Sequence, residues 1–253
     1  MSFTNKVVIV TGASSGIGEG TALLFAKEGA NLVIIGRNDV KLTVVAARCE
    51  EYGKKPLKII ADVSKEDQAV SIIDQTINKF GKIDVLINNA GILRLGKIID
   101  GTIMSIYDDL MNTNLRSVIH LTTIATPYLI KSKGNIINIS SAGGVKATRN
   151  PLFLAYAMTK NSLNIFGQGV AIELAPYGVR VNTISPGPVY SDVWKNSNIS
   201  QSEAMKDYEY KTALNRISKP EEIANLALYL AGDNAIGITG SNYLIDNGFT
   251  LMN

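Results

Sequence analysis

A tyrosine and a lysine one helical turn apart carry the clearest acid–base chemistry in the sequence. The run Tyr-Ala-Met-Thr-Lys places Tyr156 and Lys160 four positions apart in a stretch with a helical pattern. Since a helix turns once in about 3.6 residues, the phenol and the ammonium share one face. At about 4 Å and an effective dielectric of about 20, the charge favours the phenolate by about 4 kcal/mol, which takes a phenol pKa from about 10 to about 7. The pair predicts a tyrosine that exchanges protons near neutral pH.

The same spacing also fits a half-buried ring beside a solvated amine, so the interpretation depends on a glycine-rich turn upstream. Gly12, Gly16 and Gly18 lie between the apolar run of residues 7–10 and a helical pattern over residues 20–27. Such glycines allow a tight turn, close approach of a pyrophosphate and close packing of helix on strand, although glycines also cluster in ordinary turns. The helix N-terminus offers N–H groups to phosphates. The expected cofactor contacts here are Gly12, Ser14, Ser15, Gly16, Ile17 and Gly18.

Polar residues follow two more strand-like runs. Asn88-Asn89-Ala90-Gly91 comes directly after residues 83–87, and Ser140-Ser141 closes the run of residues 135–139. Ligands of open α/β folds bind at the carboxyl edge of the sheet, where both groups would lie. A plain turn and a strand-end cap remain the alternatives.

Together these motifs resemble the short-chain dehydrogenase/reductase family, in its single-domain branch of about 250 residues, over essentially the whole chain. The resemblance implies that Tyr156 is the catalytic acid/base and that Lys160 lowers its pKa and holds the nicotinamide ribose. It implies that Ser141 orients the substrate carbonyl, and that Asn114 supports a proton-relay water. It also implies cofactor contacts at Asn89, Ala90, Gly91, Pro186 and Gly187.

One departure from the family pattern concerns the serine. Ser141 and Tyr156 are fifteen positions apart, about two more than in most members. The extra residues are expected within residues 143–148. Ser141 is chosen over Ser140 as the acting residue.

The residues after the second strand bear on the cofactor. Sites that prefer NAD place an acid at the end of this strand, to bind the ribose 2′-hydroxyl. Position 36 is glycine and Arg37 follows it. Arginine can pair with a 2′-phosphate through charge-assisted hydrogen bonds, so we expect NADP(H) over NAD(H). Asp62 and Val63 resemble the adenine contact of the family.

Apolar strand-like runs alternate with helical patterns along the whole chain. The runs are β-branched and continuous, as in strands covered on both faces. Repeated β-α units predict a doubly wound parallel sheet of the Rossmann type, with seven strands and one domain over residues 1–253. The expected strands are Lys6–Val10, Asn31–Ile35, Leu57–Ala61, Val85–Asn88, Asn135–Ser140, Val179–Ile184 and Tyr243–Ile245.

The segment of residues 188–218 interrupts this alternation. Long connections of this kind are usually functional, and the resemblance implies a substrate lid; a surface insertion is the alternative. Its aromatic and apolar residues include Tyr190, Trp194 and Met205, which suggest a partly apolar ligand of moderate size.

Composition excludes several classes. Of the 253 residues 46% are hydrophobic and 19% charged, with a net charge of +3, and basic residues are interspersed with acidic ones. We therefore expect no nucleic-acid surface. One cysteine and one histidine give no disulfide, thiol pair or histidine-rich metal site. We expect no metal, no signal peptide, no membrane span and a cytoplasmic location.

These inferences predict an oxidoreductase that transfers hydride between NADP(H) and a ketone or secondary alcohol. The overall pattern looks like 3-oxoacyl-thioester reductases, and a general carbonyl reductase is ranked before a steroid or isoprenoid alcohol dehydrogenase. A non-catalytic nicotinamide-nucleotide sensor is the alternative of a different class. The resemblance implies a homotetramer that binds a small carbonyl or alcohol.

Overall fold

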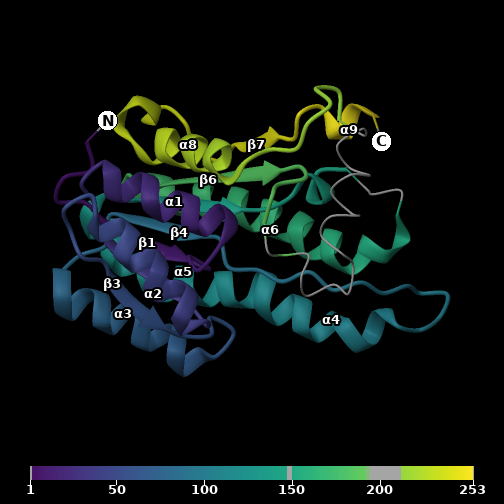
Figure 1. Ribbon diagram of the computed structural model, residues 1–253, viewed down its shortest axis with the longest axis horizontal. Coiled ribbons are helices and arrows are strands. Elements are labelled where there is room, and N and C mark those ends of the chain that lie inside the picture. The colour runs from purple at the N-terminus through teal and green to yellow at the C-terminus, as the bar shows by residue number, and fades with distance from the viewer. Residues whose placement is uncertain (1, 147–149, 192, 194–211, 253) are drawn as a thin grey trace.

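A single parallel sheet organises the chain. The computed structural model describes residues 2–146, 150–191, 193 and 212–252. Within these ranges seven strands pair in the order β3-β2-β1-β4-β5-β6-β7 (Figure 1). The strands are β1 (Val7–Thr11), β2 (Asn31–Gly36), β3 (Leu57–Ile60), β4 (Val85–Asn88), β5 (Asn135–Ile139), β6 (Arg180–Pro186) and β7 (Asn242–Ile245).

The predicted doubly wound sheet is therefore confirmed, with small shifts at strand ends. The largest shift is in β6, which continues to Pro186 because Ser185 and Pro186 pair with β7 and Gly187 N–H donates to the Ile245 carbonyl at 3.0 Å. The central strands β1, β4 and β5 are buried along their whole length. This burial explains their continuous apolar runs.

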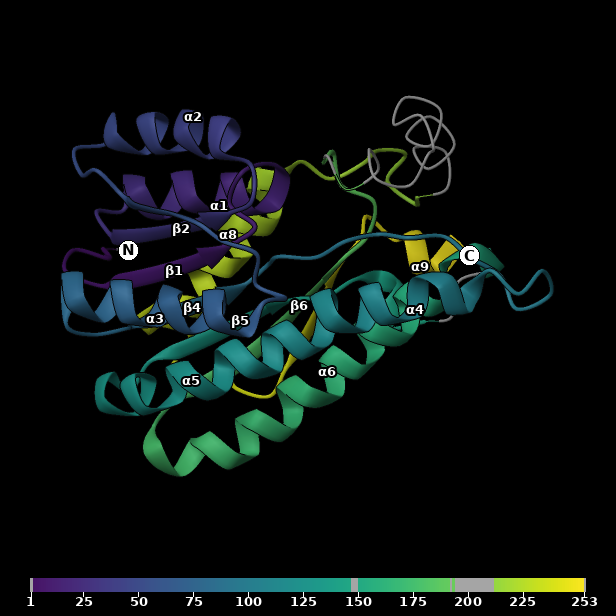
Figure 2. The ribbon, with the colours of Figure 1, turned by 90° about the horizontal axis from the view of Figure 1, so that it is seen from below.

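Helices cover both faces of the sheet. One face carries α1 (Gly16–Lys27), α2 (Asp39–Glu50) and α8 (Pro220–Ala231), and the other carries α3 (Glu66–Phe80), α5 (Ser117–Ser132) and α6 (Leu154–Leu174) (Figure 2). Two shorter helices are α4 (Ile103–Met111) and α9 (Phe249–Met252). Among the helices of the described residues, none combines the length and apolar character that a membrane crossing needs.

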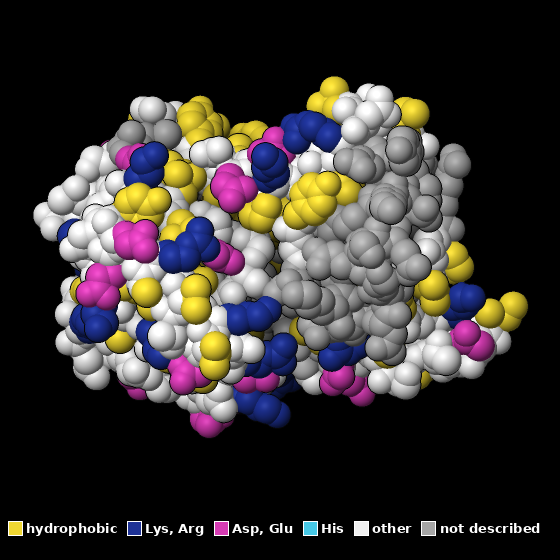
Figure 3. All heavy atoms as spheres, viewed as in Figure 1, with side chains coloured by type: hydrophobic (Ala, Val, Ile, Leu, Met, Phe, Trp, Pro, Cys, Tyr) yellow, Lys and Arg dark blue, Asp and Glu magenta, His cyan; other side chains and the backbone are white. Residues whose placement is uncertain are grey.

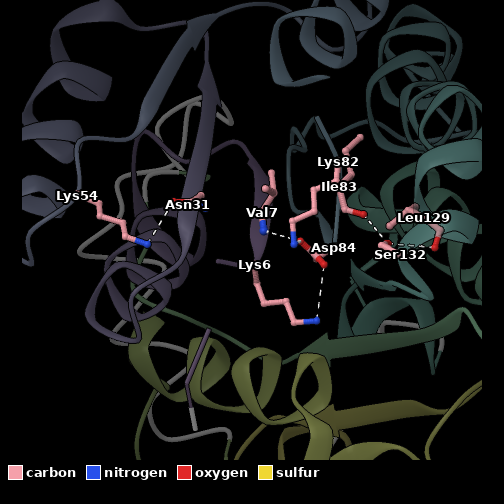
Figure 4. A network of polar contacts seen from close by, with 9 residues as sticks. All are labelled: Lys6, Val7, Asn31, Lys54, Lys82, Ile83, Asp84, Leu129 and Ser132. Atoms are coloured by element: carbon pink, nitrogen blue, oxygen red, sulfur yellow. Dashed lines mark hydrogen bonds and ion pairs between the residues drawn. The ribbon is translucent and has the colours of Figure 1, made fainter. Parts of the chain in front are cut away.

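A buried carboxylate ties the amino ends of the central strands. Asp84, just before β4, accepts a hydrogen bond from Val7 N–H at 2.8 Å and pairs with Lys82 at 2.9 Å and Lys6 at 3.6 Å (Figure 4). The contact fixes β1 against β4 at the edge opposite the predicted site. A buried acid is tolerated there because it is both paired and hydrogen-bonded.

Charged side chains on the outer surface are mixed in sign. On the face drawn in Figure 3, lysine and arginine lie among aspartate, glutamate and separate hydrophobic patches. Exposed ion pairs include Arg116 with Glu66 at 2.7 Å and Lys58 with Asp39 at 2.7 Å. Because solvent screens exposed pairs of this kind, they add little to stability.

Candidate active site

A cleft of about 440 Å³ runs along the carboxyl edge of the sheet. Because all the strands are parallel, each ends beside this cleft, and the sheet order becomes the order of residues along it. Starting from β3 the lining residues that follow successive strands are Asp62, Arg37, Gly12, Asn89, Ser141, Gly187 and Phe249. The glycine turn and Arg37 therefore lie toward the β3–β1 end of the cleft, and Ser141 and Phe249 toward the β5–β7 end.

Glycines shape the end of the cleft where β1 meets α1. Gly12 and Gly16 have φ of +66° and +56°, the left-handed region that favours glycine. A Cβ on Gly18 would lie 2.2 Å from the Gly12 carbonyl oxygen, so Gly18 serves the packing of helix on turn and does not line the cleft. The side chain of Ser15 at the N-cap of α1 does not cap the helix. A phosphate fits this cradle, with N–H groups and the positive end of the helix dipole facing it.

Asn89 locks this cradle to the end of β4. Its Nδ2 donates to the carbonyls of Thr11 at 2.8 Å and Gly12 at 3.2 Å. The Thr11 hydroxyl in turn accepts from the N–H groups of Asn89 and Ala90, each at 3.0 Å. The amides predicted to contact a cofactor therefore also hold the glycine turn in shape.

Ser141 and Tyr156 meet in the cleft despite the longer spacing between them. The turn after β5 packs tightly on α6, because a Cβ on Gly144 would lie 2.6 Å from the Lys160 carbonyl carbon. The Ser141 hydroxyl accepts from Gly143 N–H at 3.2 Å and contacts the Tyr156 phenol. Ser140 instead donates its hydroxyl hydrogen to the Lys160 carbonyl at 3.0 Å. This geometry agrees with the choice of Ser141.

The pKa of Tyr156 departs from the prediction of a value near 7. Desolvation raises the pKa of the phenol above 10.0, and the hydrogen bond with Ser141 lowers it only in part. The ammonium of Lys160 does face the ring, at 5.9 Å from its centroid, but it donates to the Ile139 carbonyl at 2.9 Å. Lys160 is itself buried, and desolvation lowers its pKa to about 8. The prediction was wrong because it counted the neighbouring charge and left out burial.

Asn114 lies behind the cleft and not on its surface. It is fully buried in a π-helical turn, Asn112–Arg116, between α4 and α5. Its side chain accepts from Ile92 N–H at 2.8 Å and donates to the Ile92 carbonyl at 2.9 Å and to the Thr159 hydroxyl at 3.2 Å. Thr159 donates to the Tyr156 carbonyl at 2.7 Å. Asn114 is thus coupled to the helix turn that carries Tyr156.

The β2–β3 end of the cleft carries the charged residues Arg37, Lys41 and Asp62. Arg37 is largely exposed, and its Nη1 lies 3.8 Å from the Asp62 carboxylate. The pKa of Asp62 is below its ordinary value: burial opposes this, and hydrogen bonds from Ser64 and the charges of Arg37 and Lys65 outweigh it. A Cβ on Gly36 would lie 3.2 Å from that of Ser14, so the Ser14 side chain would have to shift by a few tenths of an ångström to admit a side chain there.

The predicted lid is described only at its ends. Tyr190 N–H donates to the Ser218 carbonyl and Ser218 N–H to the Pro188 carbonyl, each at 3.1 Å, so the two ends are joined. Val189 and Val193 line the cleft. Tyr190 does not; it borders an adjoining depression with Glu19 and Arg48. Trp194 and Met205 lie outside the described residues.

The cleft collects most of the residues singled out from the sequence. The predicted residues that line it are Gly12, Ser14, Ser15, Gly16, Ile17, Arg37, Asp62, Val63, Asn89, Ala90, Gly91, Ser141, Tyr156, Lys160, Pro186 and Gly187.

Comparison with known proteins agrees with this geometry. A family model described as enoyl-(acyl carrier protein) reductase matches residues 12–250. A short-chain dehydrogenase/reductase of unknown function from Caenorhabditis elegans, solved with cofactor, superposes with a TM-score of 0.92 at 37% identity, covering 98% of this chain and 96% of that one. The chain belongs to the short-chain dehydrogenase/reductase family.

Two further relatives are described by a substrate class and by a bound cofactor. The 3-oxoacyl-acyl-carrier-protein reductase FabG of Thermotoga maritima is 33% identical over 261 residues, covering 99% of this chain and all of the relative. A short-chain dehydrogenase from Burkholderia cenocepacia, solved in complex with NADP, has a TM-score of 0.89 at 29% identity, with 99% and 100% of the two chains covered. The family uses nicotinamide cofactors, and this chain is an oxidoreductase acting on carbonyl or alcohol groups.

Several apolar residues of the cleft were missed from the sequence, four of them with large side chains near the reacting groups or the sheet edge. Leu93, Phe153, Val193 and Phe249 line it close to the short-chain dehydrogenase/reductase motifs. Phe153 could have been found from its place one helical turn before Tyr156. Phe249 could have been found from its place just after the last strand, since strand carboxyl ends face the ligand.

The buried ammonium of Lys160 predicts a pH-dependent stability. In the unfolded chain this group keeps its proton to about pH 10.5, whereas in the folded protein its pKa is about 8. Between these values the unfolded state binds more protons, so stability rises with pH and the cost of the buried charge is largest below about pH 8. Between about pH 7.5 and about pH 9, we expect the free energy of unfolding of wild type to rise by about 1 kcal/mol relative to that of Lys160→Met.

Urea unfolding of both proteins at the two pH values measures this difference. Other titrating groups, such as the buried thiol of Cys49 whose pKa is raised to about 11, are common to both proteins and cancel. Lys131→Met, at an exposed lysine near the end of α5, is the matched control and should show no pH-dependent difference. Parallel pH profiles for wild type and Lys160→Met would contradict the buried charge.

Proposed function

We propose that the protein is an NADP(H)-dependent carbonyl reductase that converts a ketone into a secondary alcohol. The observation that carries the proposal is the meeting of Ser141, Tyr156 and Lys160 in one cleft whose other end holds the glycine cradle and Arg37. Position 36 is a glycine where NAD-preferring sites carry an acid. This glycine and the cation at Arg37 support NADP(H) over NAD(H). The relative solved with NADP is consistent with this choice.

The residues take the following roles in the proposed reduction. When bound, the nicotinamide supplies the hydride that reaches the carbonyl carbon. Ser141 holds the carbonyl oxygen and Tyr156 gives it the proton, so that one hydride and one proton complete the alcohol. A phenol whose pKa is raised is fully protonated at neutral pH, which suits an acid in the reducing direction. Lys160 holds the cofactor ribose. Together with Asn114, which lies behind the cleft, it also forms the path by which the proton of Tyr156 is replaced.

Gly91 lies close to the side chains of both Asn114 and Lys160. A Cβ there would lie 3.3 Å from the Asn114 Oδ1 and 3.6 Å from the Lys160 Nζ, so the side chains of both approach the backbone after β4. The Asn114 side chain is bonded to Ile92 and Thr159, which fixes the turn beside Lys160. A proton relay between Asn114 and Lys160 is part of the proposed mechanism.

The loss of NADPH absorbance over a panel of ketones, quinones and 3-oxoacyl thioesters tests the function. We expect turnover with at least one class, and with NADPH above NADH. The competing function is a nicotinamide-nucleotide sensor, which would bind NADPH tightly and leave the whole panel unreduced. The complete set of Asn114, Ser141, Tyr156 and Lys160 favours the enzyme, since a sensor has no use for a proton donor.

An exposed apolar stripe on α6 supports the proposed homotetramer. Met158, Ile165 and Ile172 are spaced by seven positions, share one face and are 44%, 62% and 79% exposed. A second apolar group near the C-terminus includes Leu244 and Leu251, which are 42% and 83% exposed. Two separate apolar surfaces on one chain are what an assembly with two kinds of interface requires.

A further inference from the structure

The chain after β7 folds into a fixed turn beside the cleft. The carboxylate of Asp246 accepts hydrogen bonds from Gly248 N–H at 2.9 Å, and from the N–H and hydroxyl groups of Thr250 at 2.8 Å each. Asp246 is itself buried. These bonds set the direction in which Phe249 leaves the turn.

The same turn is attached to three parts of the active site. A Cβ on Gly187 would lie 2.6 Å from that of Asp246, so the turn packs directly on the residue after β6. Lys146, from the segment that follows Ser141, donates to the Thr250 carbonyl at 2.9 Å. Asn247 donates to the Ser218 hydroxyl at 2.9 Å, at the end of the proposed lid. Phe249 is therefore held in place relative to the reacting groups.

Phe249 lies at the opposite end of the cleft from the charged residues. The charged side chains among the described lining residues are Arg37, Lys41 and Asp62, at β2 and β3, and Lys160 at the reacting group. Strand order places β6 and β7 beyond β5, and so beyond Ser141. Phe249 therefore belongs to the part of the cleft that a substrate enters.

A cluster of apolar side chains from other elements packs on the ring of the proton donor. Leu93 follows β4 and is 2% exposed, and it packs in one cluster with Phe153, Val193 and the ring of Tyr156. All of these side chains and Phe249 line the same cleft. An apolar surface of this kind, next to one proton donor, is the usual composition of a small-molecule subsite.

We propose that Phe249, with Phe153 and Leu93, forms a subsite for an apolar, aromatic-sized substituent on the carbonyl substrate, and that Phe249 determines specificity. The proposal rests on the proposed reductase function and narrows its substrate class to neutral ketones with an apolar arm. Aromatic side chains bury large apolar areas and favour offset or edge contacts with rings. A hydrophobic pocket discriminates about tenfold or more even for one methylene.

Two ketones that differ only at the end of one arm test the subsite. We expect wild type to reduce 4-phenyl-2-butanone with a higher kcat/KM than 4-hydroxy-2-butanone. Phe249→Ala should lower kcat/KM for the phenyl ketone about tenfold and change that for the hydroxy ketone less than about twofold. Val44→Ala, at a 55% exposed side chain of α2 outside the cleft, is the matched control and should change neither.

A binding measurement separates this proposal from the reductase function. The affinity of 4-phenyl-2-butanone for the NADP-loaded protein should fall about tenfold in Phe249→Ala and by a smaller factor in Phe249→Leu, which serves where the alanine variant does not fold. If Phe249→Ala loses affinity for 4-phenyl-2-butanone but wild type turns over neither ketone, the result supports the subsite and contradicts the reductase function. Unchanged affinity and unchanged preference between the ketones overturn the subsite, even where both are reduced.

Discussion

Tyr156→Phe is expected to lower kcat for carbonyl reduction by about 10² to 10⁴, the usual contribution of a general acid. The change removes one hydroxyl group from a ring that packs against Leu93 and Phe153. The pKa of the phenol is raised by burial, so the wild-type group carries its proton throughout the neutral range. The variant has nothing in its place from which the carbonyl oxygen can take a proton. Steady-state kinetics with NADPH and a turned-over ketone measure the loss.

Cofactor affinity and two control variants make this result specific. NADPH binding, followed by fluorescence titration, should survive in Tyr156→Phe because the glycine cradle and Arg37 are unchanged. Tyr177→Phe removes a hydroxyl from a 53% exposed ring outside the cleft and should leave kcat as it is. Near-normal turnover in Tyr156→Phe would remove the proposed mechanism.

The two serines after β5 differ in a way that supports the same assignment. Ser141 contacts the phenol, whereas the Ser140 hydroxyl is used by the backbone of α6. From the sequence alone the two serines are equivalent candidates, since each lies at a strand end. Both line the cleft, and only the packing of the turn on Lys160 and Asn161 decides which hydroxyl meets the phenol.

Most of the fold followed from sequence because its signals are local and repeated. Buried β-branched runs alternating with helical patterns predict a parallel sheet, and parallel strands bring all their carboxyl ends to one edge. This rule placed Asn89 and Ser141 at one edge, whereas Gly187 was added by the family resemblance. The shifts at strand ends, such as the extension of β6 to Pro186, depend on pairing with β7, which a single run cannot show.

The properties of the site that were predicted wrongly or not seen from the sequence depend on three-dimensional surroundings. The pKa of Tyr156 moved upward and not downward because desolvation outweighs the hydrogen bond with Ser141, while the Lys160 ammonium is bonded to the Ile139 carbonyl. The bond between the Asn114 side chain and the Ile92 backbone joins positions far apart in the sequence, so it could not be seen before the structure. Phe249 belongs to no motif, and its role follows only from the turn that Asp246 holds against Gly187.

Arg37→Ala is expected to lower kcat/KM for NADPH by about tenfold to a hundredfold while leaving that for NADH nearly unchanged. Hydrogen bonds to charged groups contribute about 1.5 to 3 kcal/mol, and each 1.4 kcal/mol is about tenfold in affinity. Among the described residues the exposed guanidinium pairs with Asp62, at 3.8 Å, so little stability is lost with it. Lys41 lines the same end of the cleft and accounts for the NADPH preference that should remain.

The ratio of the two kcat/KM values is the decisive quantity, because it cancels any general loss of activity. Arg116→Ala is the matched control: it removes another exposed arginine from an ion pair, with Glu66, and does not line the cleft. Its ratio should equal that of wild type. NADH turnover as fast as NADPH turnover in wild type, or an unchanged ratio in Arg37→Ala, would show that the 2′-phosphate is not recognised by the residue that follows Gly36. In that event the absence of an acid at the end of β2 would have to be explained by packing against Ser14 alone.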